Sequence, residues 1–398
     1  MNTNSTSTYI KKEQLPALQV VRAIAILGVI TVHSTSYATV QMLESHYYFL
    51  YNFLNIFMKF GTPTFIALSS FVLFYNYIDR PVDRKLIARF YQRRMLYIVV
   101  PYIAFSLFYF VMLHLMYYPD RSLTDTINSF VSKLFTGKAY THLYFVFINM
   151  QFYLIFPLFL WIFKRYSKLT KWLIPLSLLI QWGFIIANKY SFQLDNRGSW
   201  SLSYFSYYML GATIGIFYPQ LKRWIVIQRD SFTSGRLVGL GLLWTIWLGS
   251  GLVHVFLWYQ TRMYNSSYST LWYELFYNLY SLTSIVVLIQ IAFIIYRDGY
   301  SWLGRMLAHL GSMSFGIYLI HPFFLFLYRG WIPQPSQSWF AHIWYGGGFV
   351  TALGCSWITV TLAAKYIPYA WIAFGSLPVA RSTPSTNTNL PVTEAYSK

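Results

Sequence analysis

The chain has 398 residues, of which 56% are hydrophobic, 21% aromatic and only 10% charged, whereas a soluble domain carries about a quarter charged residues. This composition excludes an ordinary soluble domain and favours lipid as the surroundings. The formal net charge of +19 comes from basic residues between hydrophobic runs. The positive-inside rule for membrane proteins explains this charge, so nucleic acid is not an expected partner.

The absence of several motifs narrows the chemistry further. The single cysteine, Cys355, lies in an apolar run, so neither an intrachain disulfide nor a cysteine metal site is possible, and we expect no metal. The chain has no glycine-rich phosphate loop, which argues against nucleotide-driven transport. The polar N-terminus lacks the cleavage site of a signal peptide, so we expect the first span to act as the targeting signal.

Ten apolar stretches, separated by charged or Pro/Gly-rich segments, predict an all-α polytopic integral membrane protein. The predicted spans are 17–39, 48–78, 95–117, 142–163, 172–188, 203–218, 237–258, 271–296, 310–328 and 342–366. They give a polar cytoplasmic N-terminus (1–14), a transmembrane domain (15–370) and a disordered cytoplasmic tail (371–398). Gly183, Gly211 and Gly215, in the two short stretches, predict close packing or tilted, partly re-entrant helices.

The distribution of basic residues predicts the orientation. With the N-terminus inside, 22 of the 30 Lys and Arg residues fall in cytoplasmic segments and seven in external ones, while Lys59 lies within the second stretch. This ratio places both termini in the cytoplasm, with nine or eleven spans as the alternatives. The expected location is a cell membrane that the chain crosses several times.

Two ionisable residues, Arg22 and His33, lie in the first apolar stretch. In a helix they share a face to within roughly 20° and stand about 16 Å apart along the axis. In a purely structural interpretation, Arg22 reaches the cytoplasmic interface and His33 is a packing residue. The functional interpretation rests on the cost of an ionisable group at membrane depth. A neutral imidazole there can act as general base toward a hydroxyl.

A basic segment, 79–94, leads into the third stretch. Its charges fix the orientation of the chain in the membrane. Arg89, Arg93 and Arg94 also lie close together at an expected helix start, where they can hold the phosphates of a cytosolic donor. The two roles are compatible.

Other polar residues lie within apolar stretches. Taken singly, each is more often a partner in an interhelical hydrogen bond than a catalyst. Glu44, in the first external loop, and Glu274 are the candidate carboxylate partners of His33. The remaining polar residues are His142, Asn149, Gln151, Tyr153, Ser314, Tyr318 and His321.

Six segments, in order, resemble the acyltransferase-3 family of bacterial membrane acyltransferases. The family marker, an Arg and a His separated by ten residues in the first span, is matched by Arg22 and His33. Two positions differ from many members. Ser70 stands in place of a glycine, and Tyr97 stands in place of the second arginine of an Arg-x-x-Arg motif. The other matching segments are Gly61-Thr-Pro-Thr-Phe-Ile-Ala-Leu-Ser-Ser-Phe, Phe90-Tyr-Gln-Arg-Arg with Pro101-Tyr102, His142-Leu-Tyr-Phe with Gln151-Phe-Tyr and Pro157, Tyr208-Met-Leu-Gly-Ala, and Gly311-Ser-Met-Ser-Phe-Gly-Ile-Tyr-Leu-Ile-His-Pro.

The resemblance implies a stand-alone enzyme without an appended esterase-like domain. Such an enzyme moves an acetyl or similar acyl group from cytosolic acyl-CoA to a hydroxyl of a cell-surface carbohydrate or glycolipid. His33 is then the general base or a transient acyl carrier, and Arg22 stabilises charge or positions the donor. Arg89, Arg93 and Arg94 are the candidates for binding acyl-CoA. The alternatives are a polysaccharide exporter or flippase, and an inactive membrane scaffold.

Overall fold

The structure, a computed structural model, describes residues 12–227, 233–297, 301–335 and 338–378. Within these ranges the chain forms helices and no strand, which confirms the all-α prediction. The N-terminus up to residue 11 and the tail from residue 379 were predicted to be polar and disordered, respectively, and they lie outside the described residues.

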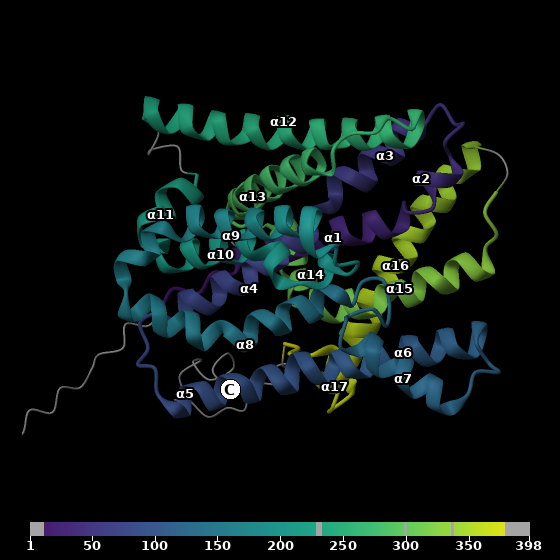
Figure 1. Cartoon of the computed structure of the whole chain (residues 1–398), viewed down its shortest axis with the longest axis horizontal. Helices are drawn as coiled ribbons and strands as arrows, with labels where there is room; N and C mark the ends of the chain where they lie inside the picture. Colours follow the sequence, from purple (N-terminus) through teal and green to yellow (C-terminus); the bar gives the residue numbers. More distant parts are fainter. Residues whose placement is uncertain (1–11, 228–232, 298–300, 336–337, 379–398) are drawn as a thin grey trace, which may run out of the picture.

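The helices follow the predicted apolar stretches. The N-terminal half contains α1 (Ala17–Ser34), α2 (Ala38–Gln41), α3 (Tyr48–Phe57), η1 (Met58–Phe60), α4 (Gly61–Tyr77), α5 (Arg84–Arg94), the π-helical turn η2 (Met95–Val99), α6 (Val100–Tyr117), α7 (Leu123–Leu134), α8 (Tyr144–Arg165), η3 (Ser167–Trp172) and α9 (Leu173–Ala187). The C-terminal half contains η4 (Asn188–Phe192), η5 (Arg197–Ser199), η6 (Ser201–Tyr204), α10 (Phe205–Ile216), α11 (Tyr218–Ile225), α12 (Ser234–Tyr264), α13 (Thr270–Ile295), α14 (Trp302–Ser312), α15 (Ser314–Trp331), α16 (Ser338–Tyr366) and α17 (Trp371–Phe374). Figure 1 shows the long helices running along one common axis, with α1 in the middle of the bundle.

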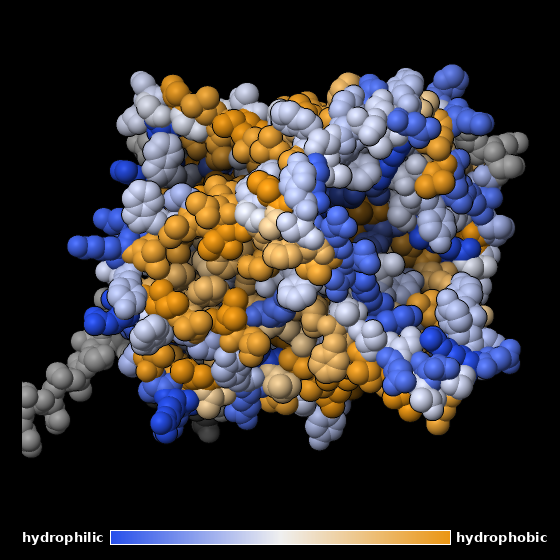
Figure 2. All heavy atoms as spheres, viewed as in Figure 1, coloured by the Kyte–Doolittle hydropathy of each residue, from blue (hydrophilic) through white to orange (hydrophobic). Residues whose placement is uncertain are grey.

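The polytopic prediction is confirmed by helix length and composition. In the described part of the chain, eight helices are long and apolar enough to cross a membrane. A ninth span is added if α14 and α15, which meet at 76°, count as one. The remaining predicted span, 203–218, contains α10, whose 12 residues are fewer than the roughly 20 that a crossing requires. Figure 2 shows apolar side chains over the middle of the face in view and hydrophilic ones toward both ends.

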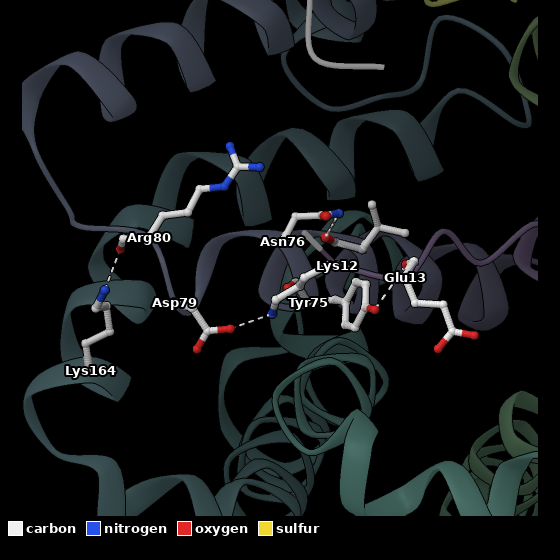
Figure 3. A network of polar contacts seen from close by, with 8 residues as sticks. Lys12, Glu13, Tyr75, Asn76, Asp79, Arg80 and Lys164 are labelled. Carbon is white, nitrogen blue, oxygen red and sulfur yellow. Dashed lines mark hydrogen bonds and ion pairs between the residues drawn. The ribbon is translucent and has the colours of Figure 1, made fainter. Parts of the chain in front are cut away.

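Segments predicted to be cytoplasmic meet at one end of the bundle, called here the basic end. Lys12, ahead of α1, pairs with Asp79 at the end of α4 at 2.7 Å. The Tyr75 hydroxyl donates to the Glu13 carbonyl, and Lys164 at the end of α8 donates to the Arg80 carbonyl (Figure 3). These contacts show that the segments which the charge count places on one side of the membrane lie together.

Two glycines allow α10 to pack closely against α4. A Cβ atom at Gly211 would overlap the Ala67 carbonyl oxygen of α4, and one at Gly215 would lie 2.6 Å from the Phe71 carbonyl oxygen. Spaced one helical turn apart, they allow the backbones of α10 and α4 to approach closely, as small residues do in membrane helix pairs. The prediction of close packing is therefore confirmed for Gly211 and Gly215. A Cβ atom at Gly183 would meet no described atom within 4 Å, so Gly183 does not take part in such close packing.

The boundary predicted at residue 370 lies inside folded structure. Helix α17 follows it, and Phe374 is buried. Gly375 adopts a φ of +71°, and a Cβ atom there would lie 2.6 Å from the Tyr97 carbonyl oxygen and 2.7 Å from the Phe315 ring. The predicted tail therefore begins too early, because its first residues supply apolar side chains that cover α6 and α15.

Candidate functional site

Helix α1 carries both residues of the predicted pair. Arg22 and His33 lie on one uninterrupted helix of 18 residues, and their spacing corresponds to about 16 Å along its axis. Arg22 lies toward the basic end and His33 near the opposite end. The two side chains therefore cannot contact the same reacting atom. Of the two roles predicted for Arg22, only positioning of the donor is compatible with His33 as the base.

Arg22 is joined by a second arginine at the basic end. Its Nη1 donates to Gln19 Oε1 at 3.3 Å, and its guanidinium lies within electrostatic range of Arg94 and Tyr153. The Arg94 guanidinium stacks over the Tyr153 ring at 4.9 Å, and the Tyr153 hydroxyl lies 2.9 Å from Ser69 Oγ. Three distant helices, α1, α5 and α8, thus bring two cations to one place.

Arg22 and Arg94 have few hydrogen-bond acceptors around them within the described residues. Arg94 Nε and the nearby Tyr208 hydroxyl are buried and have no hydrogen-bond partner among the described residues. The ion pairs between described residues use other carboxylates, on Asp79, Glu274 and Glu13. Buried donors and like charges without a carboxylate suit an anionic ligand that accepts hydrogen bonds, such as a phosphate.

The other predicted arginines take different positions. Arg89 is exposed and lines a cavity of about 370 Å³ together with Arg80 and Lys85. Arg93 is half-buried on the last turn of α5. Tyr97, at the position of a second motif arginine, packs edge-on against Trp371 at 5.8 Å. Arg22 therefore supplies the second guanidinium next to Arg94, from another helix.

His33 lines a second cavity, called here the outer cavity, of about 360 Å³. Its walls come from α1, η1, α4, α8, α12 and α13. Most of its polar and aromatic side chains can donate a hydrogen bond or stack on a ring, which suits a sugar. They are Lys59, Thr62, Tyr144, His254, Trp258, Tyr273, Glu274 and Tyr277.

Two further histidines stand behind His33. The His33 and His321 rings meet edge to face with centroids 5.2 Å apart, and His321 and His142 follow at 5.6 Å. The Tyr318 hydroxyl donates to the His142 carbonyl. The sequence singled out His142, Tyr318 and His321 as polar residues in apolar stretches, but only the fold brings them to His33.

Backbone carbonyls fix the tautomers of these two histidines. His321 Nδ1 lies 2.8 Å from the Tyr318 carbonyl oxygen, and His142 Nε2 lies 3.2 Å from that of Leu319. Because a carbonyl oxygen only accepts, each of these nitrogens carries the proton. The other nitrogens, His321 Nε2 and His142 Nδ1, are buried, and no described residue forms a hydrogen bond with them. Each ring therefore keeps a bare, basic nitrogen close to His33.

The local sequence explains the position of His321. Pro322 follows it inside α15 and has no N–H for the Tyr318 carbonyl, four residues earlier. The His321 imidazole takes the place of that missing donor. Helix α14 packs against the start of α1 at Gly311, where a Cβ would overlap the Gln19 carbonyl. After the bend of 76° that follows α14, α15 carries His321 to the His33 ring near the other end of α1.

Arg329 of α15 closes the same end of α1. Its Nη2 donates to the carbonyls of His33 at 2.9 Å and Ser34 at 3.2 Å, and its guanidinium lies 3.8 Å from the Tyr37 ring centroid. A cation on the last carbonyls of a helix is a favourable cap. Arg329 thereby fixes the backbone that carries His33.

Neither predicted carboxylate is a hydrogen-bonding partner of His33. Glu44 is exposed in the turn after α2. Glu274 lines the outer cavity, but its carboxylate pairs with Arg197. The neighbours of His33 are imidazoles and an arginine, and among the described residues no group of His, Cys, Asp or Glu is arranged to hold a metal ion.

Comparison with known proteins decides the family. The family model described as an acyltransferase domain, acyltransferase-3, matches residues 15–361. The chain belongs to the acyltransferase-3 family. The family is the one that the six segments predicted, and the described helices supply its membrane-spanning part. No solved structure matches this chain.

Curated relatives come from Staphylococcus aureus. The protein of strain MRSA252, named a probable poly-beta-1,6-N-acetyl-D-glucosamine export protein, is 29% identical over 52% of this chain and 59% of its own length. The protein of the same name from strain MSSA476 is 31% identical over 42% of this chain and 48% of its own length. The chain thus spans about half the length of the curated relatives that it matches.

Proposed function

We propose that this membrane acyltransferase moves an acyl group, in the first instance acetyl, from acyl-CoA at the basic end to a hydroxyl of an extracytoplasmic carbohydrate. The observation that carries the proposal is the placement of two complementary sites along one helix. Arg22 and Arg94 bring two guanidinium groups together near one end of α1, which supports an anion site there, and His33 lines a cavity near the other end.

The separation of the two sites suits acyl-CoA. In this donor, an extended pantetheine arm separates the phosphates from the thioester. With phosphates at Arg22 and Arg94, the arm spans the distance of about 16 Å to His33. The exposed cavity with Arg80, Lys85 and Arg89 offers further cations for the remaining phosphates.

The chemistry at His33 follows from its surroundings. A neutral imidazole takes the proton of the acceptor hydroxyl as that oxygen attacks the thioester carbonyl. The carbon–sulfur bond breaks, the thiolate leaves with the proton, and an ester and free CoA result. The position of His33 inside the bundle and the nearby Arg329 guanidinium both favour a neutral His33, because burial and a neighbouring cation disfavour a second positive charge.

Two features support a carbohydrate as the acceptor. Aromatic rings and hydrogen-bonding groups line the outer cavity, and the relatives' names refer to poly-beta-1,6-N-acetyl-D-glucosamine. The positive-inside count places the basic end in the cytoplasm of a bacterial cell and the outer cavity toward the far side. A hexosamine polymer is the first acceptor class to test.

Substitution of His33 tests this proposal. We expect His33→Ala to lower O-acylation of the surface polysaccharide by at least about 100-fold, with the amount of polymer unchanged. Mass spectrometry of polysaccharide from wild-type and variant cells measures the acyl content, and a hexosamine assay measures the polymer. His46→Ala, an exposed histidine in the turn before α3, is the matched control. Unchanged acylation in His33→Ala overturns the assignment.

Export of the polymer is the second candidate, because the relatives are named export proteins. The same experiment separates the two functions. An exporter or flippase whose path runs through the outer cavity loses polymer from the surface when His33 is replaced. An acyltransferase loses only the acyl groups.

A further inference from the structure

Acyl transfer requires a positive partner for the carbonyl oxygen. Attack by the hydroxyl turns this oxygen into an oxyanion, and a fixed cation or donor at that point lowers the barrier. Arg22 is too far from His33 to serve. Arg329 already binds the carbonyls at the end of α1.

Lys59 offers a cation on the wall of the cavity that His33 lines. It lies in η1, the short 3-10 turn between α3 and α4, and lines the outer cavity together with His33. Its ammonium stands 5.0 Å from the centroid of the Trp258 ring. Trp258 is held in turn, since its Nε1 donates to His254 Nε2 at 3.0 Å. The Tyr277 hydroxyl donates to the Lys59 carbonyl at 3.4 Å and ties the turn to α13.

The charge of Lys59 is not neutralised within the described residues. The one carboxylate that lines the cavity belongs to Glu274, which pairs with Arg197. Arg262, whose guanidinium lies 4.9 Å from the centroid of the same Trp258 ring, binds the neutral side-chain oxygens of Asn52 and Asn55. An uncompensated ammonium at membrane depth is costly, and such groups mark functional sites. A transient negative charge in the cavity would compensate it.

We propose that Lys59 is a catalytic residue that stabilises the oxyanion formed when the acceptor hydroxyl attacks the acyl carbonyl at His33. This inference rests on the proposed function. Lys59 donates a hydrogen bond to the carbonyl oxygen while His33 holds the hydroxyl proton. When the carbon–sulfur bond breaks, the oxygen returns to a neutral carbonyl, the proton passes to the thiolate, and Lys59 remains an ammonium.

Kinetics of transfer from radiolabelled acetyl-CoA test the proposal. Permeabilised membranes of the native host, with the wild-type gene replaced by each variant, incorporate label into their own glycan. We expect Lys59→Met to lower the maximal rate by about 100- to 1000-fold, with KM for acetyl-CoA within about threefold of wild type. Lys59→Arg, which keeps the charge, should retain more activity than Lys59→Met. Lys189→Met, whose lysine lies outside the cavity and donates to Ser269 Oγ at 2.9 Å, should match wild type.

Retained acetyl-CoA binding by the purified variant, measured by calorimetry, shows that the fold is intact. If methionine prevents accumulation of the protein, Lys59→Gln provides the same test with a polar side chain. A maximal rate within twofold of wild type, or a loss confined to KM for acetyl-CoA, overturns the role of Lys59. A wild-type membrane that transfers no label contradicts the proposed function itself, so the two failures are distinguishable.

Discussion

The imidazoles of His33 and His321 meet edge to face, with centroids 5.2 Å apart, although they belong to the first and ninth apolar stretches of the chain. His321 is fully buried, and its Nε2 has no partner among the described residues. The contact places a basic nitrogen next to the proposed general base. The first two predictions concern this pair.

Replacing His321 by phenylalanine keeps a ring of similar size but removes both nitrogens. We expect His321→Phe to lower the acyl-transfer rate at least about tenfold while acetyl-CoA binding is retained, because the anion site at Arg22 and Arg94 is distant. Radiolabel transfer and calorimetry measure the two quantities. His309→Phe, at the Trp357 Nε1–His309 Nδ1 hydrogen bond of 3.0 Å, is the control. Equal transfer rates in the two variants would contradict the role of His321.

Pro322 leaves the Tyr318 carbonyl free for the His321 imidazole. In Pro322→Ala, a backbone N–H at position 322 competes for that carbonyl, a hydrogen bond worth about 0.5–1.5 kcal/mol. We expect a melting temperature equal to or above that of wild type, together with a lower transfer rate. Pro157→Ala removes a proline from the interior of α8, away from the histidines, and should leave the rate unchanged. A wild-type rate in Pro322→Ala would show that the proline does not position His321.

Arg94 and Arg22 form the proposed phosphate site. Arg94→Ala removes a charged donor with a buried, unpartnered Nε, and we expect acetyl-CoA affinity to fall about 10- to 100-fold, or roughly 1.5–3 kcal/mol. Calorimetry in detergent measures the affinity. We expect the melting temperature of the variant to equal that of wild type. Arg84→Ala, an exposed arginine at the start of the same helix α5, is the control. Retained donor affinity in Arg94→Ala refutes the donor role.

Gly211 sets the contact between α10 and α4. A Cβ there overlaps the Ala67 carbonyl oxygen, so Gly211→Ala should lower the free energy of unfolding by about 1–3 kcal/mol through overpacking. Gly183→Ala adds a Cβ in open space and should be neutral or stabilising by up to about 1 kcal/mol. Thermal unfolding in detergent compares the two. Equal melting temperatures in Gly211→Ala and Gly183→Ala would contradict the importance of the close contact between α10 and α4.

The amino-acid sequence determined the class of protein, the apolar stretches that form helices, and the Arg22 and His33 pair. These features are local, because hydropathy and the helical repeat act over neighbouring residues. The ordered motifs also predicted the family that the family model then confirmed. The tail boundary at residue 370 was misplaced, since α17 is too short to give a periodic signal and is held by its packing.

Only the tertiary structure decided which polar residues share a site. Arg22 joins Arg94 from another helix, and His142 and His321 reach His33 through the bend after Gly311. Lys59 was merely a charge within an apolar stretch until η1 placed it on the wall of the outer cavity. Helix periodicity assigns a face to each residue but not the helix that this face meets. That choice depends on close backbone contacts, such as those at Gly211 and Gly311, between segments far apart in the chain.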